Sequence, residues 1–157
     1  MSRAPADPLP LSAAERRLAG LLRFFAALFL VGALAFFVRP NGTLADLDRV
    51  GAALGLASLP PRDEPLAADF WLALAVANMA TIAACSWLAA GDVRRRRALV
   101  YPLIVSKLTS STAGVILFVT RAHALAYLSA PLVDLPIAVV TVAALRAALP
   151  PGDPRRI

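Results

Sequence analysis

Four apolar segments of about twenty residues each dominate this chain and restrict what it can fold into. They cover about residues 20–38, 70–90, 98–119 and 124–145 of a sequence of 157 residues. A helix of about 20 apolar residues is the length needed to cross a hydrocarbon layer roughly 30 Å thick. Hydrophobic residues make up 59% of the chain and charged residues only 17%, whereas soluble proteins carry about 25% charged residues. The sequence therefore predicts an all-α integral membrane protein, a bundle of four transmembrane helices.

The two ends of the chain lie outside these segments and contain several prolines. We expect residues 1–11 to form a disordered leader and residues 150–157 a disordered tail, which leaves residues 12–149 as one membrane domain. Ser12 followed by Glu15 fits a capping box, so a helix should begin there. A basic start followed by an apolar run is also typical of a cleaved signal peptide. This run is longer than the apolar core of most signal peptides and ends in bulky residues, which favours a retained first span.

The longest polar stretch lies between the first and second apolar segments, at residues 39–69. A short helix within it has one apolar side, formed by Leu44, Leu47, Val50 and Leu54. We expect this helix to be amphipathic and to lie on the membrane surface in the first outer loop.

Basic residues are distributed unequally between the two ends of the expected bundle. Eleven arginines flank one end and four flank the other. Because loops rich in Lys and Arg stay in the cytoplasm, this bias predicts that both termini are cytoplasmic. The larger group includes four residues that we expect to set the topology and to contact anionic lipid headgroups: Arg94, Arg95, Arg96 and Arg97. Since this arrangement explains the net charge of +6, nucleic acid is not expected as a partner.

The residue usage of the chain suggests its source. The sequence contains no glutamine and one lysine, and it is rich in alanine, arginine, leucine and proline. This bias is typical of a high-GC bacterial genome, so we expect a multi-pass protein of the cell inner membrane. The layout of four spans with an outer loop after the first is similar, in architecture alone, to small bacterial membrane proteins of the DoxX-like kind. This resemblance implies no functional residue.

The third and fourth apolar segments each contain one charged residue, Lys107 and Asp134. A charge inside the apolar layer costs several kcal/mol unless it has a partner. The turn between the two segments is centred near residue 121 or 122, so Lys107 lies at the depth of about residue 136 in an antiparallel hairpin. That is less than one helical turn from Asp134 at a rise of ~1.5 Å per residue. We therefore predict a Lys107–Asp134 salt bridge or a shared hydrogen-bonded network. Pro131 and Pro136 flank the aspartate and weaken its helix, because neither can donate a backbone hydrogen bond.

Uncharged polar residues of the second, third and fourth segments fall at similar depths. Ser110 and Gly114 form a small-xxx-small pair that permits close helix approach. The same hairpin arithmetic, applied around the arginine turn, places Asn78 level with about Ser111. We expect one polar cluster inside the bundle, made of Lys107, Asp134, Asn78, Thr81, Ser110, Ser111 and Thr141.

The sequence contains no reaction motif. It has no Ser/His/Asp set and no paired carboxylates within the apolar segments, so catalytic residues are not expected. The chain has one cysteine and one histidine, too few for a zinc or iron–sulfur ligand set. We therefore expect no cofactor and no bound metal.

Three roles for the polar cluster stay open. It can fix the register of the helices in a non-catalytic, structural or accessory membrane protein, which is the role we favour. It can bind a ligand, an ion or a proton in a small-solute carrier that uses Lys107, Asp134 and Asn78. Such a carrier is expected to be an oligomer, because four helices make a narrow pathway. It can also meet a charge on another protein. The expected partners are membrane lipids, further copies of the chain or a larger membrane complex.

Overall fold

The computed structural model describes residues 10–59 and 65–149, and every regular element in these residues is helical. Most of the expected leader and the whole expected tail lie outside the described residues. The elements in chain order are α1 (Ala13–Val38), α2 (Pro40–Ala53), α3 (Pro65–Gly91), the 3₁₀ turn η1 (Arg97–Val100), α4 (Tyr101–Thr120) and α5 (Leu125–Ala148).

Four of these helices are long and apolar enough to cross a membrane. The segments that meet this criterion are Ala13–Val38, Phe70–Gly91, Arg97–Thr120 and Leu125–Ala148. The prediction of an all-helical chain with four spans is confirmed at this level. By length and composition of its helices, the chain is a small multi-pass membrane protein.

The first span begins at the capping box that the sequence predicts. The Ser12 hydroxyl accepts a hydrogen bond of 3.2 Å from the backbone N–H of Glu15. The Glu15 carboxylate accepts one of 2.7 Å from the backbone N–H of Ser12. Two N–H groups that a helix start would leave unsatisfied are thereby satisfied, and α1 continues without a break to Val38.

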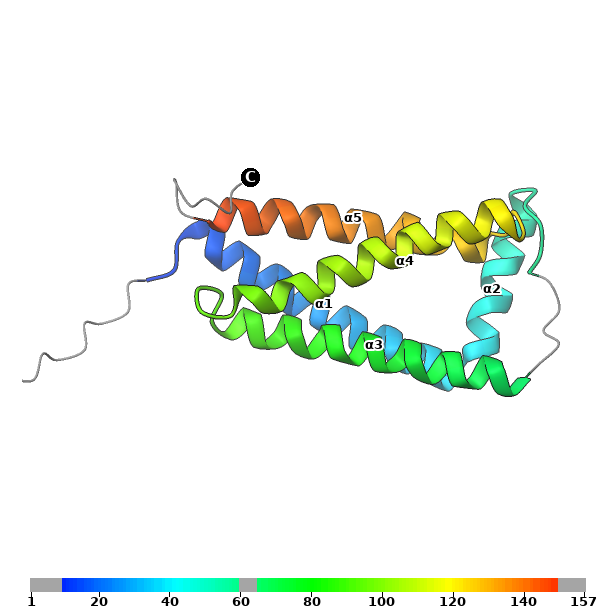
Figure 1. Cartoon of the computed structure of the whole chain (residues 1–157), viewed down its shortest axis with the longest axis horizontal. Coiled ribbons are helices and arrows are strands. Elements are labelled where there is room, and N and C mark those ends of the chain that lie inside the picture. The colour runs from blue at the N-terminus through cyan, green and yellow to red at the C-terminus, as the bar shows by residue number, and fades with distance from the viewer. Residues whose placement is uncertain (1–9, 60–64, 150–157) are drawn as a thin grey trace, which may run out of the picture.

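The four long helices form two pairs (Figure 1). Helix α1 packs along α3, and α4 packs along α5, so each pair consists of consecutive spans. The beginning of α1 and the end of α5 lie at the same end of the molecule. At the opposite end, α2 runs across the bundle and contacts both α1 and α5.

The apolar core is concentrated where α1 begins, α3 ends, α4 begins and α5 ends, which we call the core end. Residues there that are almost completely buried include Leu18, Leu22, Ile82, Val100 and Leu103. Many large apolar side chains elsewhere point outward, among them Leu30, Val31, Phe37, Trp71 and Val119. Exposed apolar surface of this extent is typical of a lipid-facing bundle, because a soluble monomer rarely exposes so much of it.

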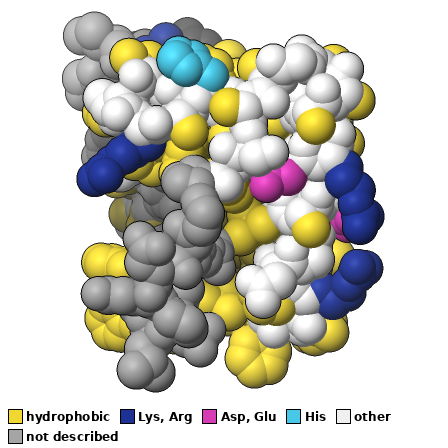
Figure 2. Space-filling view, turned by 90° about the vertical axis from the view of Figure 1, so that its right-hand side faces the viewer, with side chains coloured by type: hydrophobic (Ala, Val, Ile, Leu, Met, Phe, Trp, Pro, Cys, Tyr) yellow, Lys and Arg dark blue, Asp and Glu magenta, His cyan; other side chains and the backbone are white. Residues whose placement is uncertain are grey.

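Helix α2 occupies the polar stretch between α1 and α3. Pro40 begins it, a favourable residue at a first helical position. Leu44 and Leu47 are half-buried, whereas Val50 and Leu54 are exposed. The end of the molecule at which α2 lies is shown in Figure 2, where Lys and Arg side chains appear at both edges of the face. The position of α2 relative to a membrane surface stays a prediction.

Candidate functional site

An ion pair joins α4 to α5 inside the bundle. The Lys107 Nζ lies 3.0 Å from the Asp134 Oδ1, and their side chains are only 8% and 14% exposed. The other carboxylate oxygen, Oδ2, accepts a hydrogen bond from the Ser110 hydroxyl. Both oxygens of Asp134 therefore have donors from α4, as the depth calculation for this hairpin predicts.

The ammonium group of Lys107 also contacts the third helix of the site, α1. Its Nζ lies 4.4 Å from the centroid of the Phe29 ring, and Phe29 is buried. A cation over an aromatic ring at this distance is attracted by the ring's negative face, more strongly where water is excluded. Phe29 therefore connects the ion pair to the other helix pair, a contact that the sequence analysis missed because this ring is one of several in an apolar run.

The backbones of α4 and α5 approach closely about two turns beyond the ion pair. A β-carbon at Gly114 would come within 2.6 Å of the Tyr127 carbonyl oxygen and 2.8 Å of the Pro131 Cδ. Pro131 and Pro136 both lie inside α5. The small residue predicted to permit helix approach is therefore at the point of contact.

The other residues of the expected cluster are placed less centrally. Ser111 is buried and donates to the Lys107 carbonyl at 2.7 Å. Thr81 donates to the Ala77 carbonyl and Thr141 to the Ile137 carbonyl, each within its own helix. A hydroxyl in a helix has this local alternative four residues back, so it needs no partner on a neighbouring helix. The structure thus brings Lys107, Asp134 and Ser110 together but leaves Thr81 and Thr141 out.

A cavity of about 430 Å³ adjoins the ion pair, with residues of all five α-helices in its wall. Its polar wall consists of Asn78, Ser106, Lys107, Ser110, Ser129 and Asp134. Asn78 donates to the Ser106 hydroxyl at 3.0 Å and not to the ion pair. Ser106 and Ser129 were not anticipated, although Ser106 directly precedes Lys107 in the sequence.

A second buried acid, Glu15, lies at the core end. Arg94 binds it through both carboxylate oxygens, at 2.7 and 2.8 Å, and also donates to the Pro10 carbonyl at 2.8 Å. The Arg97 guanidinium lies 3.9 Å from the same carboxylate. The hydrogen bond with Glu15 raises the pKa of Arg94 above its ordinary value.

The remaining two arginines of the run make weaker contacts. Arg95 lies 3.7 Å from Asp92, with its side chain 89% exposed, and Arg96 reaches the Leu88 carbonyl at 3.4 Å. The run therefore divides: Arg94 holds α1 against the turn after α3, and Arg95 and Arg96 extend from the surface. Contact of these side chains with lipid headgroups stays a prediction.

The chemistry available within the described residues is limited. They contain no group of three His, Cys, Asp or Glu side chains that could hold a metal ion.

No protein-family model, no curated protein and no solved structure matches the chain. Fold and site together define a small multi-pass membrane protein with an internal ion pair beside a cavity.

Proposed function

We propose that this protein is a non-catalytic, structural or accessory component of the cell inner membrane, in which the Lys107–Asp134 pair fixes α4 against α5. One observation carries the proposal: each charge has its partner within the same helix pair, 3.0 Å away. Within the described part of the chain, moreover, no buried side-chain nitrogen or oxygen lacks a hydrogen-bond partner. A site that must capture a charged substrate would instead keep a polar group available.

The orientation belongs to the same proposal. Both termini would face the cytoplasm, because eleven of the fifteen arginines of the sequence fall in the flanks of that side, among them the four from Arg94 to Arg97. Membrane lipids would surround the exposed apolar faces, and another copy of the chain or a larger membrane complex would be the protein partner.

The test replaces each partner and then exchanges them. Lys107→Ala and Asp134→Ala each leave one buried charge uncompensated and should lower both the yield of folded protein and its unfolding temperature in detergent. The exchange Lys107→Asp with Asp134→Lys should recover part of this loss, because the two charges again compensate one another. Thr109→Ala, an exposed position on the same helix, serves as the control. Single variants with the unfolding temperature of the wild type would refute a structural pair.

The cavity supports a second candidate, a small-solute or proton carrier. Its volume of about 430 Å³ falls within the range of about 300–1,000 Å³ that is usual for small-molecule sites. An amide, three hydroxyls and both charges line it, so a small solute with one polar group would suit it. A carrier of this size would act as an oligomer.

One preparation separates the two candidates. The protein is purified in native lipid, and the material that accompanies it is identified by mass spectrometry. A stoichiometric protein would favour the accessory role, and a stoichiometric small molecule the carrier. Ala75→Phe narrows the cavity from α3 without changing the ion pair, so it should release a bound small molecule but leave a protein partner in place.

A further inference from the structure

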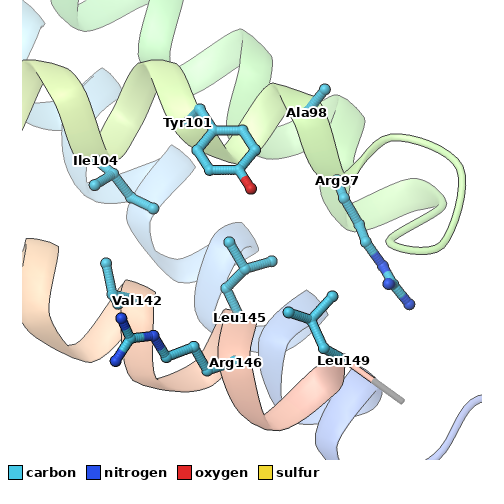
Figure 3. Close-up of a pocket in the computed structure, with 8 residues that line it drawn as sticks. All are labelled: Arg97, Ala98, Tyr101, Ile104, Val142, Leu145, Arg146 and Leu149. Atoms are coloured by element: carbon cyan, nitrogen blue, oxygen red, sulfur yellow. The ribbon is translucent and has the colours of Figure 1, made fainter. Parts of the chain in front are cut away.

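A groove separates α4 from α5 at the core end, distinct from the central cavity. Its volume is about 240 Å³, and eight residues line it. Figure 3 shows Arg97 and Arg146 at opposite edges, with the Tyr101 hydroxyl directed between them. The rest of the lining is apolar and includes Ile104, Val142 and Leu145.

The charge of this groove is positive. Arg146 is exposed and forms no ion pair with any residue that the structure describes. Arg97 faces the same groove but also lies 3.9 Å from Glu15. It therefore adds positive charge at the edge of the groove, although Glu15 already provides it with a partner. No acidic side chain lines the groove. An anion with a guanidinium on one side and a phenol donor beside it would therefore be bound here.

The apolar part of the groove continues toward the middle of the bundle. One turn further along each helix, Leu108 of α4 and Val139 of α5 are 44% and 58% exposed. They share the groove's helix faces, because residues three or four apart lie above one another on a helix. A ligand that follows both surfaces must have an anionic end and a long apolar part.

We propose that this groove is a binding site for an anionic phospholipid. The headgroup phosphate would be held by Arg146 and the Tyr101 hydroxyl, with an acyl chain along Val142 and Val139. The groove lies at the ends of two helices that are long and apolar enough to span a membrane, so it would be near the level of the lipid phosphates. A soluble phosphate would contact Arg146 and the Tyr101 hydroxyl, but it has no apolar part to bury against Val142 and Val139.

The experiment measures lipid binding to the purified full-length protein by native mass spectrometry. Phosphatidylglycerol should bind more tightly than phosphatidylcholine, and Arg146→Gln should weaken the tightest phosphatidylglycerol site about fivefold, the effect of about 1 kcal/mol per basic residue at a membrane surface. Ala98→Phe, which fills the groove without a change in charge, should also weaken that site. The unfolding temperature of each variant is compared with that of the wild type before lipid binding is measured. If Ala98→Phe lowers the unfolding temperature, the proposal is tested with Arg146→Gln alone.

Two controls separate a built site from general attraction. Arg95→Gln removes the same charge at the same end, from a side chain outside the groove, and should leave the tightest site nearly unchanged. Glycerol phosphate, which has the headgroup but no acyl chain, should not displace the lipid at equal concentration. Equal weakening by Arg95→Gln and Arg146→Gln, or displacement by glycerol phosphate, would overturn the proposal.

Discussion

The carbonyl oxygen of Tyr127 in α5 faces Gly114 of α4, within 2.6 Å of the position that a β-carbon would take there. Pro131, four residues after Tyr127, has no N–H with which to satisfy this carbonyl. The bare glycine lets the backbone of α4 approach it, an arrangement in which weak Cα–H···O contacts form between helices. The carbonyl that Pro131 leaves without a backbone donor therefore lies against Gly114, which has no side chain to block the approach of the two helices.

Gly114→Ala should destabilise the protein. The added methyl group would meet the Tyr127 carbonyl and the Pro131 ring, which lies 2.8 Å from the β-carbon position, and overpacking of this kind costs about 1–3 kcal/mol. Gly20→Ala is the matched control, because apart from the backbone of its own helix nothing lies within 4 Å of its β-carbon position. It should be neutral or stabilising by up to about 1 kcal/mol. Unfolding in detergent, followed by circular dichroism, measures both. Equal effects at the two glycines would contradict the close contact.

Removal of one charge should cost more than removal of both. Lys107→Met leaves Asp134 buried without its cation, and breaking a buried pair in this way costs about 3–5 kcal/mol. Lys107→Met combined with Asp134→Leu removes the uncompensated charge and should recover most of that loss. The same unfolding measurement applies. A double variant as unstable as the single one would mean that the lysine acts through its contact with Phe29 and not through the aspartate.

The Glu15–Arg94 contact should stabilise the fold measurably, unlike the exposed pair beside it. Glu15→Gln keeps the size of the side chain but removes its charge and leaves one oxygen in place of the two that accept from Arg94, for which we expect a loss of about 1–3 kcal/mol. Asp92→Asn alters the pair with Arg95, whose side chain is 89% exposed, and should cost at most about 1 kcal/mol. If both substitutions cost the same in a denaturation series, Glu15 does not hold α1 in place.

The proposed orientation can be tested with single cysteines. In a Cys85→Ala background, Arg121→Cys reports the turn between α4 and α5, and Arg95→Cys reports the turn after α3; both positions are exposed. A membrane-impermeant maleimide applied to intact cells should label Arg121→Cys. Arg95→Cys should react only after the cells are permeabilised. The reverse pattern would place the termini outside.

The features that the sequence predicts best are those that a membrane makes obligatory. Four long apolar segments have few alternatives to helices, and a lone charge in each of two consecutive segments has few alternatives to a pair. Helix arithmetic within one short hairpin was then sufficient to place Lys107 beside Asp134.

The contacts between the two helix pairs were not predicted, for a physical reason. Spacing shows which residues share a face of one helix, but helices that are apolar all round give no sign of which face turns inward. Phe29 therefore could not be distinguished from the neighbouring phenylalanines, and Thr81 was assigned to the interior although its side chain is exposed. Glu15 and Arg94 are 79 residues apart, and no local pattern connects them.

The pairing of consecutive spans has a consequence for synthesis. The two members of the intramembrane ion pair belong to the last two helices, so Lys107 emerges from the ribosome 27 residues ahead of Asp134. At ~5–20 residues per second, the interval is on the order of a few seconds. During that time an ammonium group without its acid is held near the aqueous edge by the cost of burial. We therefore expect α4 and α5 to insert together, with α4 reaching its final depth only when Asp134 has emerged.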